Sequence, residues 1–254
     1  MSATTPTRTQ TERADQTRTR ILDAAIREFS ENGLAGARTE QIAEAAGVNK
    51  ALLYYYFRSK EALYEAALGS IAEGVRATSL AVLDANASAG ERFLRSVLDH
   101  FDRIHSNWRF QSLMQQEMMR LHRGEDHALT PLVETIFKPL TARLQEVIDE
   151  GIATDELIAV DSQQIRYAAL GANVFYFLSA PLMGMITGTD LLERSVLASR
   201  RKSTVEFLGQ SIFTDRQYGA RVARLVLETT PMPETGGIRP RPTPELRSQK
   251  TLTK

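Results

Sequence analysis

Apolar residues recur at three- and four-residue intervals along most of this 254-residue chain. That spacing places them on one side of an α-helix. The first segment to show it carries a run of such residues: Ile21, Leu22, Ala25, Ile26 and Phe29. No stretch alternates apolar and polar residues as a half-buried strand does. The pattern therefore predicts an all-α fold of about nine or ten helices over the body of the chain, about Thr17 to Glu228.

Capping residues and glycines set the expected ends of these helices. Gly33 and Gly47 are typical of helix C-termini, whereas Thr39, Asn49 and Ser59 are typical of N-caps. Together with the apolar spacing, they predict a first helix that ends at Gly33 and further helices over 40–46, 50–57, 60–84, 89–105, 107–123, 130–150, 162–186, 190–213 and 215–228.

The two ends of the chain differ from the body in composition. Residues 1–15 are rich in Thr, Gln and Arg and contain hardly an apolar side chain, which is typical of a flexible arm. Residues 229–254 contain five prolines and two adjacent glycines, so we expect a disordered tail there.

Charge and residue content exclude several classes of protein. The chain has 31 basic and 31 acidic residues, so any affinity for nucleic acid must come from a local patch. It has no cysteine, which excludes disulfides and thiol catalysis and fits a reducing, cytoplasmic location. The four histidines lack the spacing of a helical metal site, and no phosphate loop or nucleophile motif is present. We therefore expect no enzyme activity, metal or cofactor.

Residues 167–189 form an uncharged stretch. Its length can cross a bilayer, but a helix buried on all sides in an oligomer has a similar composition. Asn173 and Pro181 dilute its apolar character, and no other segment resembles a span. We expect the buried helix, and a membrane-tethered protein is the alternative.

The stretch GVNKALLYYYFRSK, residues 47–60, combines aromatic rings with cations and holds no carboxylate. Its glycine can form the tight turn between two short helices, as in a helix-turn-helix unit. The second helix then has two faces, with Leu53, Tyr56 and Phe57 pointing inward and Ala51 and Tyr55 pointing outward.

The outward face suits the major groove of DNA. Ala51 permits close approach of the helix, and Leu52 can touch a thymine methyl group. The hydroxyls of Tyr54 and Tyr55 can donate to phosphate oxygens, while the two lysines of the stretch neutralise phosphate charge. An aromatic run at helical spacing can also be core, and we accept that interpretation for the inward face alone.

The segment from Arg18 to about Leu68 resembles the DNA-binding domain of the TetR/AcrR family of bacterial transcriptional regulators. The resemblance rests on ILDAAIREFSENGLAGARTEQIAEAAGVNKALLYYYFRSKEAL. It implies a three-helix DNA-binding domain over residues 16–64. The stretch and the resemblance together predict DNA contacts at Thr39, Asn49, Lys50, Ala51, Leu52, Tyr54, Tyr55 and Lys60. Two of these, Ala51 and Leu52, depart from the family's frequent Gly and Thr or Ser, which bears on base preference.

The resemblance also implies that residues 65–228 form a larger helical domain for effector binding and dimerisation. The residues themselves favour dimerisation, because the helix expected at 162–186 is apolar nearly all round. That helix and the next one, pairing with their symmetry mates, would form a four-helix interface. A two-fold homodimer of this kind matches a palindromic operator.

The effector site is less well defined by the sequence. Glu117 falls near the centre of an apolar stripe, where a carboxylate needs a partner or a proton. It either anchors a small, largely apolar effector or forms an internal ion pair. The candidate effector-binding residues are Phe101, His105, Trp108, Met114, Glu117, Met118, Phe175 and Tyr176, although aromatic and Met residues at helical spacing are usually core.

These features predict a homodimeric, ligand-responsive DNA-binding transcriptional regulator. We expect a repressor that leaves its double-stranded DNA operator when the effector binds. The alternatives are an interaction module that keeps the helix-turn-helix but binds no DNA, and a membrane-tethered regulator.

Overall fold

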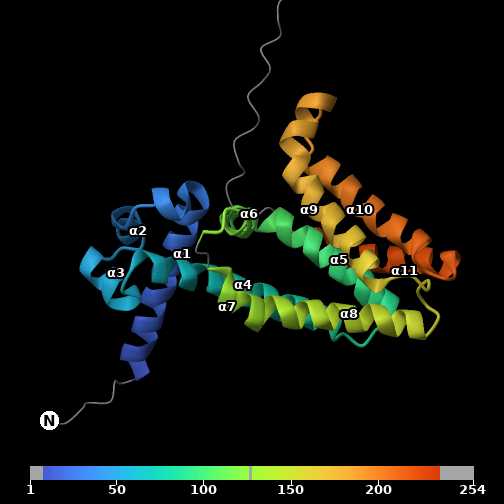
Figure 1. Ribbon diagram of the computed structural model, residues 1–254, viewed down its shortest axis with the longest axis horizontal. Coiled ribbons are helices and arrows are strands. Elements are labelled where there is room, and N and C mark those ends of the chain that lie inside the picture. The colour runs from blue at the N-terminus through green and yellow to red at the C-terminus, as the bar shows by residue number, and fades with distance from the viewer. Residues whose placement is uncertain (1–7, 126–127, 235–254) are drawn as a thin grey trace, which may run out of the picture. The chain divides into compact units, whose positions relative to one another are not determined.

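The computed structural model describes residues 8–125 and 128–234, and these are almost entirely helical (Figure 1). The helices are α1 (Arg8–Gly36), α2 (Thr39–Ala45), α3 (Lys50–Phe57), α4 (Lys60–Leu83), α5 (Ala89–Ser106), α6 (Trp108–His122), α7 (Leu129–Leu132), α8 (Lys138–Ala153), α9 (Ser162–Thr187), α10 (Arg194–Ser211) and α11 (Arg216–Thr229). A π-helical turn, η1 (Val133–Phe137), separates α7 from α8. No strand forms in the described part of the chain, which confirms the all-α prediction. Most of the tail predicted for 229–254 lies outside the described residues.

The described residues divide into two compact units. The first comprises the chain up to Thr78 together with Arg109–Pro139, and the second comprises Ser79–Trp108 and the chain from Leu140 onward. The first unit thus takes in more than the 16–64 segment that the sequence suggests. It includes α6 because this helix is hydrogen-bonded to α1. The Ser112 hydroxyl of α6 donates to the Ser30 carbonyl of α1 at 2.8 Å.

The first unit has an apolar core built largely from α1, α2, α3 and α4. Its fully buried side chains include Ile21 and Phe29 of α1, Ile42 of α2, Leu53 of α3 and Leu63 of α4. Phe29 also meets the ring of Tyr64 edge-on, with 4.9 Å between the centroids. Since α2 and α3 have only 7 and 8 residues, they depend on this packing for their stability.

Glycines with positive φ lie where α1 and α2 were predicted to end. Gly33, with φ 67°, interrupts the helical backbone of α1 before its last turn, and Gly47, with φ 66°, lies between α2 and α3. A residue with a side chain rarely adopts such angles, so both turns favour glycine.

The predicted caps of α3 and α4 are confirmed, whereas that of α2 is wrong. Asn49 and Ser59 each accept a hydrogen bond from the amide three residues later, at 2.8 and 3.0 Å. At α2 the N-cap is Arg38, which makes no side-chain cap bond, and Thr39 is the first helical residue. Its hydroxyl meets that of Tyr54, so a tertiary contact has replaced the local cap.

The flexible arm predicted for residues 1–15 is wrong from Arg8 onward, because α1 already begins there. Residues 1–7 lie outside the described part of the chain. Once the packed turns after Ile21 have nucleated the helix, each further residue adds a backbone hydrogen bond at little cost. A polar composition therefore did not prevent the helix from extending toward the N-terminus.

The helix predicted over 130–150 is divided into α7, η1 and α8. Pro139 has no amide hydrogen, so the chain cannot make the regular bond to the carbonyl four residues earlier. The wider π turn directly before it accommodates this missing bond.

In the second unit, α5, α8, α9, α10 and α11 surround one apolar core. Phe93, Val97 and Val147 are among its fully buried residues. Helices α10 and α11 lie close together because two glycines face each other. A Cβ on Gly219 would collide with the carbonyl oxygen of Gly209.

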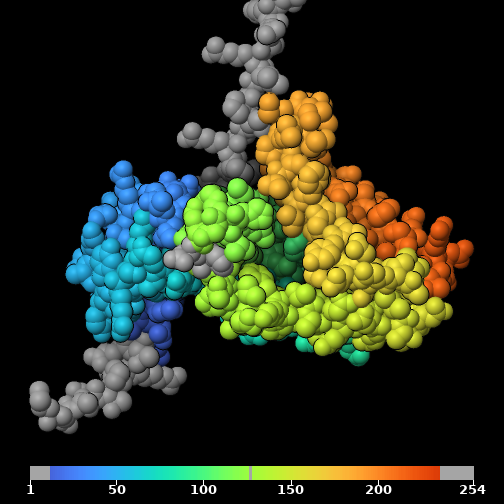
Figure 2. All heavy atoms as spheres, viewed as in Figure 1, coloured from blue at the N-terminus to red at the C-terminus, as the bar shows by residue number. Residues whose placement is uncertain are grey.

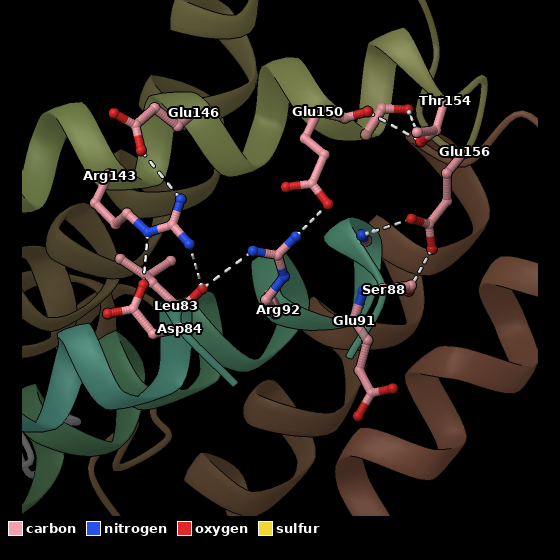
Figure 3. Close-up of polar contacts among 12 residues, drawn as sticks. Leu83, Asp84, Ser88, Glu91, Arg92, Arg143, Glu146, Glu150, Thr154 and Glu156 are labelled. Atoms are coloured by element: carbon pink, nitrogen blue, oxygen red, sulfur yellow. Dashed lines mark hydrogen bonds and ion pairs between the residues drawn. The ribbon is translucent and has the colours of Figure 1, made fainter. Parts of the chain in front are cut away.

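A polar network closes the end of α4 in the second unit (Figure 3). Arg92 of α5 donates to the Leu83 carbonyl at 3.2 Å and to Glu150 of α8 at 2.5 Å. Arg143 of α8 donates to Asp84 at 2.6 Å. The C-terminal end of α4 thus finds the partners that its free carbonyl groups require.

Helix α9 is long and apolar as predicted, but a single chain leaves much of it uncovered. Phe175, Leu182 and Ile186 are 67, 60 and 67% exposed, and Figure 2 shows the gold surface of α9 open on one face of the second unit. By length and hydropathy, both α4 and α9 are long and apolar enough to cross a bilayer. The expectation that only the 167–189 segment resembles a span is therefore wrong. The expected burial of α9 on all sides is thus not reached within a single chain.

Candidate nucleic-acid interface

Helix α3 separates a buried face from an exposed one. Leu53 and Phe57 are buried, as predicted. On the other face Tyr55 is 80% exposed, and Leu52 and Ala51 are also exposed. The side chains predicted to enter the groove are therefore accessible.

The sequence predicts that Tyr56 points inward, but its side chain is only half-buried. Its ring packs edge-on against Tyr55, at 5.6 Å between centroids, and lies 6.3 Å from the ring of Phe57. The helix is so short that this inward position falls at the edge of the core.

Hydroxyl groups from α2 and α3 meet at the junction of the two helices. The Tyr54 hydroxyl lies 3.2 Å from that of Thr39, which is buried, whereas Tyr54 is half-buried. Only one hydroxyl hydrogen is needed for this bond, so the other can be donated to a phosphate oxygen.

Lys50 forms an exposed ion pair with Glu40, which joins α3 to α2. The hydrogen bond from Lys50 lowers the pKa of Glu40, and the same bond raises the pKa of Lys50. Lys50 therefore carries its full charge, although Glu40 offsets that charge in the free protein. Sequence reasoning missed Glu40 because the partners lie ten residues apart on different helices.

Lys60 is the first residue of α4, and Asn49 is the N-cap of α3. The ammonium group of Lys60 donates to the Ala35 carbonyl at 3.1 Å, which leaves two further hydrogens for an anion. The amides of a helix N-terminus favour an anion at the same place.

Comparison with known proteins assigns the chain to a family. The family described as "Bacterial regulatory proteins, tetR family" matches residues 21–67, and "Tetracyclin repressor-like, C-terminal domain" matches residues 91–208. HTH-type transcriptional regulator RutR of Escherichia coli (strain K12) is 33% identical over 180 residues, which cover 67% of this chain and 78% of RutR. The chain belongs to the TetR family of bacterial transcriptional regulators.

Solved structures extend the likeness of this TetR-family chain over most of its length. A putative transcriptional regulator from Saccharomonospora viridis in complex with choline matches with a TM-score of 0.64 at 18% identity, covering 78% of this chain and 98% of that one. FadR from Bacillus subtilis in complex with stearoyl-CoA gives a TM-score of 0.56 at 22% identity, covering 74% and 97%. These likenesses confirm the predicted fold, an N-terminal helix-turn-helix domain followed by a helical domain.

Glu117 is fully buried in the first unit of the TetR-family chain. Its carboxylate accepts hydrogen bonds from the Tyr64 hydroxyl at 2.8 Å, from Arg120 at 2.9 Å and from the Ala128 amide at 2.6 Å. Burial, and then the bond to Glu117, raise the pKa of Tyr64, which remains a donor. The internal ion pair that the sequence left as one alternative is therefore formed.

The remaining effector candidates differ in their surroundings. In the second unit Phe101 and His105 are buried and Trp108 is half-buried, and the Phe101 ring lies 6.4 Å from that of Tyr176. Met114 of the first unit is also buried.

Two candidates, Met118 and Phe175, are 52 and 67% exposed. Helical spacing could not show that they lie on the outer sides of α6 and α9 in a single chain. Among the residues that the structure describes, no three acidic or histidine side chains gather as a metal site would require.

His100 of α5 is a half-buried histidine near Asn173, with 3.5 Å between Nδ1 and the amide nitrogen. Burial, and then the charge of Arg103, lower the pKa of His100 to about 3. The folded chain therefore holds this ring neutral at pH values where the unfolded chain protonates it.

We expect the free energy of unfolding to fall as the pH drops below about 6.5 and toward 3, by about 1.4 kcal/mol per pH unit from His100. The sign follows because the unfolded state binds the proton that the folded state excludes. Urea unfolding at pH 7, 6 and 5 would measure the slope. The His100→Gln variant should lack this component, and equal slopes in the two proteins would contradict the assignment.

Proposed function

We propose that this TetR-family chain is a homodimeric, cytoplasmic repressor that binds a palindromic operator and leaves it when a small, largely apolar effector binds. The proposal rests on one observation, that α3 has a buried face and an opposite exposed face. Its buried face is fixed by the core, and its exposed face offers Ala51, Leu52 and Tyr55 to the major groove. The same features favour a regulator over an enzyme and over a module without DNA binding.

Phosphate contacts would surround this groove-reading face. We assign them to Thr39, Lys50, Tyr54, Tyr55 and Lys60, while Asn49 fixes the start of α3. Support comes from the shared hydroxyl site of α2 and α3 and from the lysines near two helix N-termini. Such contacts position the protein on the duplex and supply salt-dependent affinity.

The exposed apolar side of α9, with Phe207 of α10, is the surface we propose for dimerisation. Phe175 and Leu182 lie on that side of α9. A two-fold dimer places two copies of α3 on half-sites about 34 Å apart. Its formation also covers the helix that otherwise meets the length and hydropathy of a membrane span, so we propose no membrane partner.

Effector binding would act through α4. This helix contributes Lys60–Thr78 to the first unit and its remaining residues to the second. A shift of α4 changes the spacing of the two α3 helices, and a coupling of about 1–3 kcal/mol suffices for release. The relatives crystallised with choline and with stearoyl-CoA support an organic effector, for which Phe101, Trp108 and Tyr176 are the proposed lining.

The first test is the Lys60→Gln variant. It should bind all duplex sequences more weakly and lower the slope of log K against log salt by about 1 for each phosphate that is no longer neutralised. Fluorescence anisotropy on an operator selected from a random library would measure both quantities. Normal binding at every salt concentration would contradict the assignment of Lys60 to a phosphate. A wild-type protein that binds no duplex even in dilute buffer would contradict the function.

The Glu40→Gln variant should act in the opposite direction. Removing this carboxylate frees Lys50 from its ion pair, so affinity for DNA should rise and the salt slope should steepen. Glu44→Gln is the matched control, because Glu44 is an exposed residue of the same helix. An equal gain in both variants would show a general charge effect and no role for the pair.

A further inference from the structure

We infer that Arg18 and Arg58 form a second phosphate-binding site at the C-terminal end of α3. The site lies outside the DNA contacts assigned above. It rests on the proposed function, because it extends the same interface.

Arg58 directly follows α3 and has φ 55° and ψ −45°. Its amide donates to the Tyr54 carbonyl at 2.9 Å, and its side chain is exposed. A residue with a side chain adopts this φ under strain, whereas glycine adopts it freely. Its side chain forms no hydrogen bond or ion pair with another residue of the described ranges, so no such contact accounts for an arginine at a position suited to glycine.

Arg18 of α1 brings a second cation to the same end of α3. Its guanidinium carbon lies 5.3 Å from the ring centroid of Phe57, the last residue of α3. Stacking on a ring holds the guanidinium plane and leaves its N–H edges available for a phosphate. Among the described residues, neither Arg18 nor Arg58 forms an ion pair that would neutralise it.

The length of α3 explains why cations at this end would meet DNA. Its 8 residues span about 12 Å, close to the width of the major groove. A helix of this length in the groove brings both of its ends near phosphates. The N-terminal end has Lys50, and the other end has the two arginines.

The test compares Arg18→Gln and Arg58→Gly with wild type on an operator selected from a random library by the wild-type protein. Each variant should bind roughly tenfold more weakly in dilute buffer. The salt slope of the dimer should fall by about 2, one phosphate for each protomer. Arg58→Gly also relieves the positive φ, so its Tm should be no lower than that of wild type. Weaker binding at an undiminished Tm cannot come from damage to the fold.

Arg13→Gln is the matched control, since Arg13 is an exposed arginine of the same helix. Five residues on a helix turn its side chain about 140° away from Arg18. An unchanged slope in this control supports a local contact. Equal slopes in all variants, or an equal effect in the control, would overturn the site while leaving operator binding intact. A wild-type protein that binds no duplex would overturn both the proposed function and this site.

Discussion

The Glu117→Ala variant should lose about 3–5 kcal/mol of unfolding free energy. Glu117 is fully buried, and its carboxylate is the acceptor for Tyr64, Arg120 and the Ala128 amide. Alanine removes all three bonds at once and leaves the Tyr64 hydroxyl and the Ala128 amide without their acceptor, while Arg120 retains its ion pair with Glu125 at 3.5 Å. Because burial denies these groups the compensation that water gives, the loss should far exceed that of a surface ion pair.

Chemical denaturation followed by circular dichroism would measure this loss. Glu117→Gln keeps the volume and one acceptor oxygen, so it should fall between wild type and Glu117→Ala. Glu73→Ala is the control, because Glu73 of α4 forms an exposed ion pair with Arg76 and does not contact Glu117 or its partners. Its unfolding free energy should stay within the error of the measurement. A similar value for Glu117→Ala would mean that the buried carboxylate does not hold α4 and α6 together.

The Asp102→Ala variant should lose a similar amount, about 3–5 kcal/mol. Asp102 of α5 accepts two hydrogen bonds from the guanidinium of Arg201 on α10, both at 2.7 Å. Burial raises the pKa of Asp102, and Arg201 opposes that shift. Arg201 also donates to the Thr230 carbonyl at 2.8 Å, so one cation ties α5, α10 and the end of α11. Without Asp102 it remains buried with its charge uncompensated.

A double variant separates the cost of an unpaired charge from the value of the pair. Asp102→Leu with Arg201→Met replaces both charges by apolar groups and should recover at least half of the loss. Glu206→Ala is the control, since Glu206 pairs with Lys202 at 3.8 Å on the surface of the same helix. If the double variant is as unstable as Asp102→Ala, the bonds themselves and not the unpaired charge carry the stability.

Local signals in the sequence were sufficient to predict where most of the helices lie. The range 50–57 predicted from Asn49 and the apolar spacing is the observed α3, and 162–186 differs from α9 by one residue at its end. Propensity, capping and periodicity act within one or two helical turns, so they can be read from neighbouring residues. One error arose where a partner outside that range intervened. Thr39 bonds to Tyr54 fifteen residues away in place of capping α2.

The candidate site was predictable in its residue types and faces but not in its pairings. Spacing placed Tyr55 outside and Leu53 inside, as the structure has them. It could not reveal that Glu40 offsets Lys50, or that Arg18 stacks on Phe57, because each pair joins two helices. Glu117 is a similar case. Its place in an apolar stripe predicted a buried carboxylate, but not that Tyr64 donates a hydrogen bond to it.

The order of helices, the turn glycines and the division of α3 into two faces were determined by the amino-acid sequence alone, because each depends on residues within a few positions of one another. Tertiary structure alone decided which polar groups pair, which apolar faces remain uncovered and where α1 begins. Those outcomes depend on the packing of segments distant in the chain, where burial sets the cost of every unsatisfied charge and hydrogen bond.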